Sequence, residues 1–531
     1  MNLDQAEALA DTSPQLIYPA LKDVPMRSLS LSGASALALT LAPGAALSLT
    51  AEAAWQSWVD AADEAGIALT TGSETRSGDT LSLAGVAFAF SGEDGTTISG
   101  SMGDVTFTEQ GDQTVAVTLP DSYPITVSGT DSDGASGSAL LNVRQPGGML
   151  VMSDTDDGGV ATEYDFPTVE IVLTEATTDG EAEDLDASMT MTELSGINSR
   201  GAGETPQIEG RFAAATVAFL LSGTDRESGG QFEMEITAAD VQSASTGTLS
   251  SIFTVGEDME AAIEDGFSTD GSASTGPITF SLSGDGEGET FAAEGGIAGT
   301  EVALAIDADR LDYEMGYEGV SFTASGSEIP LPEVTGMLGA LSTVVSLPAA
   351  PSEEAQPMSL SFALRDLSLG DEIWALFDPT GALPRDPATA AIALAGQVRM
   401  LQSLFSEEAM EADGPPPAEV DQLQIDELTL SVAGAELTGT GAVTLDYDAP
   451  GPFGPGTPAP DGGMTLRLAG GLGLLDTLVE MGLLPNEQAM GFRMMAGMLA
   501  RPGPDGGDVL TSEIVVQPDG TVLANGAPLP F

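Results

Sequence analysis

The side chains that could do chemistry in this sequence are almost all carboxylates. Asp and Glu number 82, Lys and Arg number 14, and the chain contains no His and no Cys. This composition excludes nucleophilic triads, histidine general bases and nearly all zinc, copper and haem sites. Paired carboxylates can act as general acid and base, but 82 acidic residues guarantee chance pairs, and none stands out. The sequence therefore predicts no catalytic residue, no metal site and no cofactor.

One acidic segment, which begins at Asp154, has some similarity to a calcium-binding loop. Such a loop needs oxygen ligands at fixed positions and Glu at the twelfth position. Here the fifth position is Gly158 and the twelfth is Asp165, and no apolar helix precedes the segment. We therefore expect a polar turn.

The segment 470–499 is rich in Leu and Met, and its spacing predicts two short helices, the second opening at Pro485 and Asn486. Two interpretations fit this hairpin. Its side chains pack on a sheet, which we favour, or its adaptable Met side chains line a site for a lipid or acyl chain. The candidate ligand-lining residues are Leu478, Met490, Phe492, Met494, Met495 and Met498.

A further helix is expected near the start of the mature chain. Thr50 can cap it, Gly66 can end it, and Trp55 and Trp58 share its apolar side. We expect the two tryptophans to anchor a core; the alternative is an exposed face on which a ligand stacks.

From residue 67 onward, apolar and polar residues alternate with a period of two. The runs TLSLAGVAFAFSG and LTLSVAGAELTGTGAVTLDY are examples, and Gly, Asp and Asn turns separate such runs. The pattern predicts a mainly β fold: one or more large, curled antiparallel sheets with a few short helices, including the C-terminal helical hairpin packed on the sheet. A sheet of this size has to curl, split or keep a concave apolar groove.

The N-terminal region has the pattern of an export signal. Residues 1–25 are unlike the rest, and we expect the true start at Met26. Arg27, an apolar run and small residues up to Ala46 predict a signal peptide over 26–46; a buried helix or strand is the alternative. No segment reaches the about 18 uninterrupted apolar residues of a transmembrane helix. We therefore predict a periplasmic or secreted protein.

The remaining chain divides by composition into two parts. Residues 47–346 form an N-terminal β-rich part and residues 358–531 a C-terminal α+β part. The segment 347–357, LPAAPSEEAQP, is the expected linker.

The net charge of −68 restricts the choice of partners. Nucleic acids and anionic membrane surfaces are bound through Lys and Arg, which are scarce here, so neither is an expected partner. A solvated acidic surface is the favoured explanation of the charge, and binding of cations or basic proteins is the alternative.

Several phrases of the sequence resemble a known bacterial family. They include TAEAAWQSWVDAADEAG, DEIWALFDPTGALPRDPATAAI and LLDTLVEMGLLPNEQAMGFRMMAGMLARPG. These are similar to domain-of-unknown-function family two-one-two-five, mostly alphaproteobacterial, over the chain from about Thr50. More distantly, the closing layout resembles AsmA-like envelope proteins. That resemblance implies an elongated, β-rich, groove-bearing protein connected with lipid handling, and it brings no catalytic residue.

Three functions are compatible with these observations. The favoured one is a non-catalytic, exported envelope protein that binds an apolar or lipid-like ligand in a β-groove. The second is a structural or interaction module of the periplasm with an envelope protein as its partner. The third is a carboxylate-based hydrolase.

Overall fold

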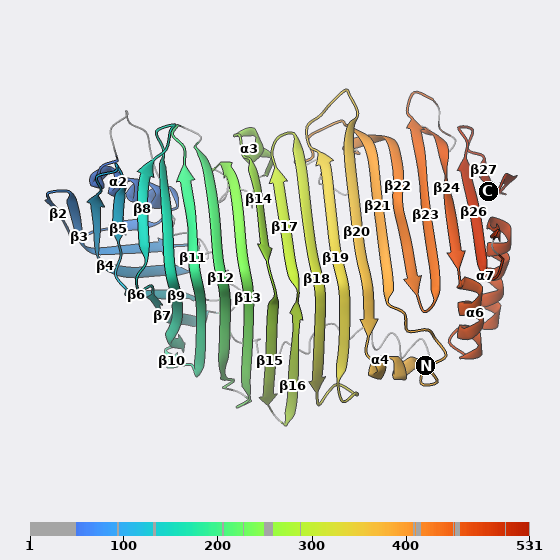
Figure 1. Ribbon diagram of the computed structural model, residues 1–531, viewed down its shortest axis with the longest axis horizontal. Helices are drawn as coiled ribbons and strands as arrows, with labels where there is room; N and C mark the ends of the chain where they lie inside the picture. The colour runs from blue at the N-terminus through green and yellow to red at the C-terminus, as the bar shows by residue number, and fades with distance from the viewer. Residues whose placement is uncertain are drawn as a thin grey trace.

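The computed structural model describes residues 49–529, apart from 93–94, 131–133, 204–205, 227, 249–258, 287, 407–408, 410–415, 450, 452–456 and 505. The strands lie side by side in one broad antiparallel sheet, which Figure 1 shows with the N-terminal strands at one end and the C-terminal helices at the other. The expected mainly β fold with few helices is confirmed.

The elements occur in the following order. The first part of the chain contains α2 (Ala51–Glu64), β1 (Ala68–Thr70), β2 (Ser73–Ser77), β3 (Thr80–Ser91), β4 (Thr97–Glu109), β5 (Val115–Thr118), β6 (Ser122–Thr130), β7 (Ser136–Arg144), β8 (Met149–Asp154), β9 (Val160–Thr178) and β10 (Glu181–Ala182). The middle contains β11 (Leu185–Arg200), β12 (Gln207–Thr224), β13 (Gln231–Thr248), α3 (Met259–Glu264), β14 (Thr269–Thr275), β15 (Ile278–Gly286), β16 (Glu289–Ile297), β17 (Gly299–Ile306), β18 (Arg310–Gly326) and β19 (Val334–Pro348). The last part contains β20 (Gln356–Leu369), α4 (Asp371–Phe377), β21 (Ala388–Met400), β22 (Ala418–Val432), β23 (Ala435–Asp446), β24 (Ala459–Ala469), α6 (Gly471–Glu480), α7 (Asn486–Leu499), β25 (Arg501–Pro502), β26 (Val509–Val516), β27 (Val522–Ala524) and β28 (Ala527–Pro528).

The strands follow one another across the sheet largely in chain order. Each strand from β18 to β23 pairs along its length with the next one, and β24 pairs with β26. Between β13 and β18, two columns each consist of two short strands, β14 with β15 and β17 with β16. The same arrangement lies between β4 and β9, where β5 and β6 form one column and β8 and β7 the next.

Irregular residues interrupt several of the long strands. Glu193 in β11, Asp240 in β13, Gly319 in β18 and Asp366 in β20 have left-handed φ angles of 50°, 50°, 59° and 58°. The break between β14 and β15 lies at the level of Asp240, as their registers with β13 show. The strand registers continue unshifted across the first three positions, and near Asp366 the register of β20 with β21 shifts between Leu364 and Leu367.

The hydrophobic core lies at the N-terminal end, where the first strands curl over (Figure 1). Helix α2 begins after Thr50, whose hydroxyl accepts from the Ala53 amide at 3.2 Å. Its Trp58 is 2% exposed, and the rings of Trp55 and Trp58 lie 6.1 and 5.2 Å from the ring of the buried Phe107. The expected helix and the expected core role of both tryptophans are confirmed.

Beyond this core, the sheet has two unlike faces. On one, which we call the apolar face, cross-strand partners form a row from β12 to β24: Phe212, Ser243, Ala273, Val302, Met315, Thr343, Phe362, Ile392, Leu428, Gly439 and Leu466. The next residues along the strands point to the other side, the polar face: Arg211, Ala244, Ser272, Ala303, Glu314, Val344, Ser361, Ala393 and Glu427. Side chains of the apolar face stay partly open to solvent; Phe362 is 43% and Ile392 39% exposed.

The segment 347–357 contains the connection between β19 and β20 together with the adjoining ends of both strands, which are hydrogen-bonded partners. The sheet therefore continues from the N-terminal part of the chain into the C-terminal part. The expected extension 1–25 and signal peptide 26–46 lie outside the described residues. Among the helices that are described, none has the length and hydrophobicity to cross a membrane.

Candidate functional site

The C-terminal hairpin is fixed to the end of the sheet through its first helix. Helix α6 contacts β23, and its start is held by the Asp508 carboxylate, which accepts from the amides of Leu472 at 3.2 Å and Gly473 at 2.7 Å. Helix α7 packs on α6, and Arg493 of α7 pairs with Asp476 of α6. The predicted hairpin on the sheet is confirmed.

The five candidate side chains of α7 do not pack on the sheet, so that expectation is wrong. Met494 is 70% exposed, and Met490, Phe492, Met495 and Met498 are also exposed, while Leu478 of α6 is partly buried. The reason lies in the small residues: Ala489 is the one buried residue of α7. The small side turns inward and the large apolar side chains turn outward, so they form an exposed patch and not an enclosed site.

The apolar face is a larger candidate surface than the hairpin. Several of its aromatic rings lie over a glycine of the neighbouring strand. A Cβ built on Gly336 would stand 2.4 Å from the ring of Phe322, and one on Gly295 would stand 2.6 Å from the ring of Phe280. Such pairs cover the bare backbone of a glycine with an aromatic ring. The outcome is a smooth apolar surface that continues over many strands.

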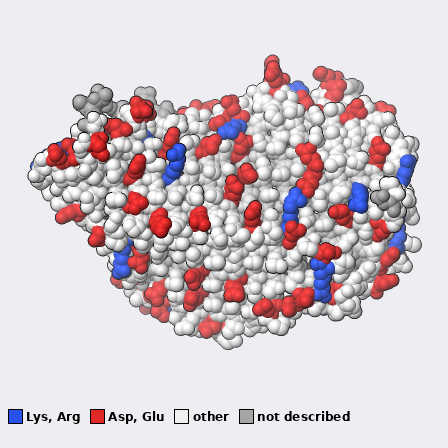
Figure 2. Space-filling view, in the orientation of Figure 1, with Lys and Arg blue, Asp and Glu red and all other residues white. Residues whose placement is uncertain are grey.

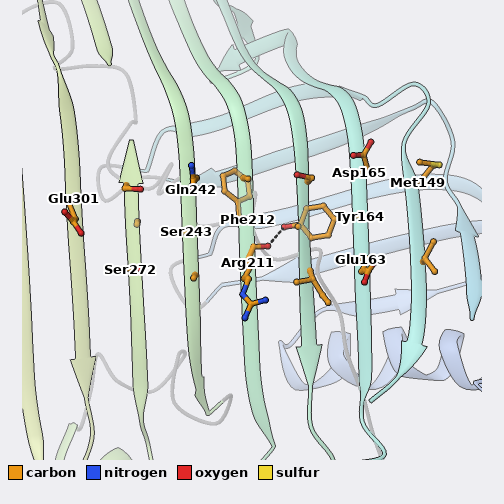
Figure 3. Close-up of a pocket in the computed structure, with 18 residues that line it drawn as sticks. Met149, Glu163, Tyr164, Asp165, Arg211, Phe212, Gln242, Ser243, Ser272 and Glu301 are labelled. Carbon is orange, nitrogen blue, oxygen red and sulfur yellow. Dashed lines mark hydrogen bonds between the residues drawn. The ribbon is translucent and has the colours of Figure 1, made fainter. Parts of the chain in front are cut away.

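The polar face has its own hollow, of about 860 Å³, shown in Figure 3. It crosses β8, β9, β11, β12, β13, β14 and β17, and we call it the Arg211 trough. Its floor consists of small side chains, and charged and apolar ones stand around them. Residues that line it include Met149, Val151, Glu163, Asp165, Ser195, Ile197, Arg211, Ala213, Gln242, Ala244, Ser272, Ser274 and Glu301. The sequence reasoning missed this site, because its residues come from strands far apart in the chain.

Arg211 differs from the other arginines in its surroundings. Every described arginine except Arg211 and Arg501 forms an ion pair with Asp or Glu, and Arg501 donates to the Asn525 carbonyl. Within the described part of the chain, the guanidinium of Arg211 has neither an ion pair nor a hydrogen bond.

The acidic segment that begins at Asp154 forms the turn between β8 and β9. The Asp157 carboxylate accepts from the Thr155 hydroxyl and, at 3.3 Å, from the Ala202 amide. The hydrogen bond from Thr155, followed by those from the Gly159 and Ala202 amides, lowers the pKa of Asp157. The expected polar turn is confirmed.

Two other carboxylates have well-defined partners. Asp378 is buried and accepts from the amides of Ala382 at 2.8 Å and Leu383 at 2.9 Å. Glu427 receives two hydrogen bonds from Arg365, at 3.0 and 2.7 Å, and these lower the pKa of Glu427. The hydrogen bonds from the Leu383 and Ala382 amides likewise lower the pKa of Asp378. A general acid near neutral pH needs a raised pKa, so neither Asp378 nor Glu427 is suited to that role.

The geometry defines the class of protein: a single, broad antiparallel sheet with a core at one end and an apolar face that continues beyond it. Residues 271–530 match a family described as uncharacterized proteins conserved in bacteria (DUF2125). The chain belongs to this family through its C-terminal half, as its sequence predicts; the match starts in β14, well after Thr50. No curated protein and no solved structure matches the chain.

Proposed function

We propose that this protein is an exported, non-catalytic envelope protein that holds an apolar or lipid-like ligand against its apolar face. The observation that carries the proposal is the row of Phe, Ile, Leu, Val and Met side chains from β12 to β24, which is partly open to solvent. Soluble proteins rarely expose continuous apolar patches beyond a few hundred Å², and larger ones mark binding surfaces.

An acyl chain is the ligand that fits this surface chemically. Covering apolar area stabilises a complex by about 25 cal/mol per Å² and needs no charged partner. The rows of the apolar face contain large side chains separated by Gly, Ala, Ser and Thr, and they contain no carboxylate between Phe212 and Leu466. The acidic residues that adjoin this row along the strands lie on the polar face, where water solvates them. The AsmA-like resemblance implies a similar use, and that resemblance stays a prediction.

Export supports the proposal, because a lipid-binding sheet of the envelope has to leave the cytoplasm. The pattern over 26–46 is the basis for this part. N-terminal sequencing of the protein recovered from the periplasm tests it. We expect a mature chain that begins near residue 47; a chain that retains residues 29–45 contradicts export by this signal.

Ligand binding is tested on protein purified without detergent. We expect native mass spectrometry and solvent extraction to find bound lipid. The substitution Phe362→Glu or Ile392→Glu should abolish the bound lipid, because a carboxylate on the apolar face is costly to cover with an acyl chain. Met337→Glu is the matched control: Met337 is 61% exposed but lies opposite Ser321 and Ser368, on the polar face, and this variant should keep its lipid.

Two outcomes contradict the lipid proposal. One is a wild-type protein that carries no lipid and takes up no fluorescent fatty acid. The other is a dimer that becomes monomeric in the Phe362→Glu variant, because a second copy would then cover the apolar face.

A second candidate function, an interaction module of the envelope, is favoured by the exposed patch of α7. Its Met and Phe side chains are the adaptable kind that protein surfaces use for varied partners. A pull-down from periplasmic extract with the wild-type protein and with Met494→Ser/Met498→Ser tests this. We expect a partner that the variant fails to capture; equal capture by both contradicts the role of the patch.

A further inference from the structure

The scarcity of positive charge makes Arg211 unusual. The chain has 14 basic residues against 82 acidic ones, and almost every described arginine is paired with a carboxylate. Carboxylates lie close to Arg211 along its own strand. Glu209, for example, lies two residues before Arg211 on the same face of the sheet. The guanidinium of Arg211 nevertheless points into the trough without an ion pair.

The neighbours of Arg211 across the strands are uncharged. Its register partners are Ile197 on β11 and Ala244 on β13. Glu163 on β9 lies opposite Ile197, so the backbones of Glu163 and Arg211 are two strand spacings, roughly 10 Å, apart. Figure 3 shows both residues at the same hollow, on either side of β11. The two side chains leave room for a small molecule between opposite charges.

The carboxylate side of the trough also has an apolar border. Val151 lies opposite Glu163, and Met149 lies opposite Asp165, all on the same face of the sheet. An ammonium group that carries methyl groups finds both a negative charge and apolar contacts at this end.

We propose that the Arg211 trough binds a small zwitterion of the phosphocholine type. Arg211 receives the anionic phosphate, because a guanidinium donates two parallel hydrogen bonds to such a group. Glu163 and Asp165 receive the ammonium. A purely anionic ligand is disfavoured by the net charge of −68, whereas the ammonium of phosphocholine cancels part of the charge on its phosphate and cancels all of it in a phosphodiester headgroup. This site lies on the face opposite the proposed lipid surface and is independent of it.

The test is isothermal titration calorimetry on the full chain at low ionic strength, with phosphocholine, inorganic phosphate and choline as probes. We expect phosphocholine to bind more tightly than inorganic phosphate and more tightly than choline. Arg211→Gln should weaken phosphocholine binding roughly tenfold or more, the loss expected for hydrogen bonds to a charged group. Arg211→Lys, which keeps the charge, should restore part of the affinity.

The substitution Glu163→Gln distinguishes a role of Glu163 in ligand binding from a purely structural role. It should weaken the binding of phosphocholine and choline but strengthen the binding of inorganic phosphate, since a negative charge near Arg211 is removed. The matched control is Arg144→Gln, because Arg144 is exposed, pairs with Glu170 and lies outside the trough. This variant should bind all three probes as the wild type does.

The outcomes separate the alternatives. Absence of phosphocholine binding, unchanged binding in Arg211→Gln, or inorganic phosphate that binds as well as phosphocholine overturns the proposal. Flotation with phosphatidylcholine vesicles that depends on Arg211 assigns the site to a lipid headgroup, and binding of free phosphocholine alone assigns it to a soluble zwitterion. Because Phe362→Glu should leave phosphocholine binding intact, failure of this proposal and failure of the lipid proposal are distinguishable.

Discussion

At the scale of single residues, Asp378 shows how a carboxylate can organise a turn. It follows α4 and lies in the segment DPTGALP, which belongs to the matched region. The hydrogen bond from the Leu383 amide, followed by those from the Ala382 amide and the Thr380 hydroxyl, lowers the pKa of Asp378 from its ordinary value of 3.8. A buried acceptor with two amide donors fixes the path of the chain from α4 towards β21.

Substitution of Asp378 by Asn should lower the melting temperature at pH 7. The amide presents a donor where the native group accepts, so an amide hydrogen bond of the turn is lost. Because the folded pKa is lowered, the stabilising effect of the charge is present above pH 3.8 and disappears as the pH falls through the folded pKa. Thermal unfolding followed by circular dichroism should therefore show a difference from wild type that shrinks below about pH 4.

Asp371→Asn is the control for this prediction. Asp371 is exposed and pairs with Arg385 at the surface, so its loss should have little effect. Equal melting temperatures of wild type and Asp378→Asn at pH 7 would contradict the structural role of the buried carboxylate.

At the scale of elements, the alternating pattern was enough to predict strands, and Thr50 and Gly66 were enough to predict α2. The expected strand pattern follows from local preference, since side chains on one strand alternate between two faces. The position of the Met side chains of α7 was not predictable in this way. Helix α7 turns Ala489 inward. Whether the side with small residues or the side with large apolar residues faces inward depends on the packing against the neighbouring helix α6.

The exposed patch of α7 should contribute little to folding stability. The variant Met494→Ser/Met498→Ser should unfold within about 0.5 kcal/mol of wild type, because both side chains are mostly solvated. Urea denaturation measures this difference. Ala489→Met is the opposite case, since the buried Ala489 has no room for a larger side chain, and it should destabilise the hairpin by about 1–3 kcal/mol. A double serine variant that unfolds much more easily would show that the patch is covered in the native protein.

At the scale of the whole molecule, the sheet has one face for water and one for apolar contact. Alternation in the sequence predicts two such faces, but it does not tell whether a second layer covers the apolar one. The Arg211 trough could not be predicted either, because Glu163, Arg211 and Glu301 line one hollow only through the register of strands from β9 to β17. Register depends on which residues of two strands pair, and the local sequence of one strand does not specify it.

The charge of the molecule leads to a prediction about salt. Acidic side chains are scattered over the side of the sheet shown in Figure 2, with few basic ones among them. Their mutual repulsion is screened beyond about 10 Å at 0.1 M salt, so the melting temperature should rise between low and high NaCl concentration. Potassium chloride should have the same effect if screening is the cause. A larger effect of one cation would indicate specific cation binding, and a melting temperature that falls with salt would contradict dominance of repulsion.

The chain order of the strands has a consequence for how the protein reaches its native state. From β18 to β23, each strand pairs with the one that follows it in the chain. Short loops close quickly, so pairing between successive strands is kinetically favoured over pairing between distant ones. The core around α2 and Phe107 is synthesised before the strands from β18 onward. The sheet can then lengthen by one hairpin at a time, and each newly added strand is the template for the next until β26, which follows the two C-terminal helices in the chain, pairs with β24.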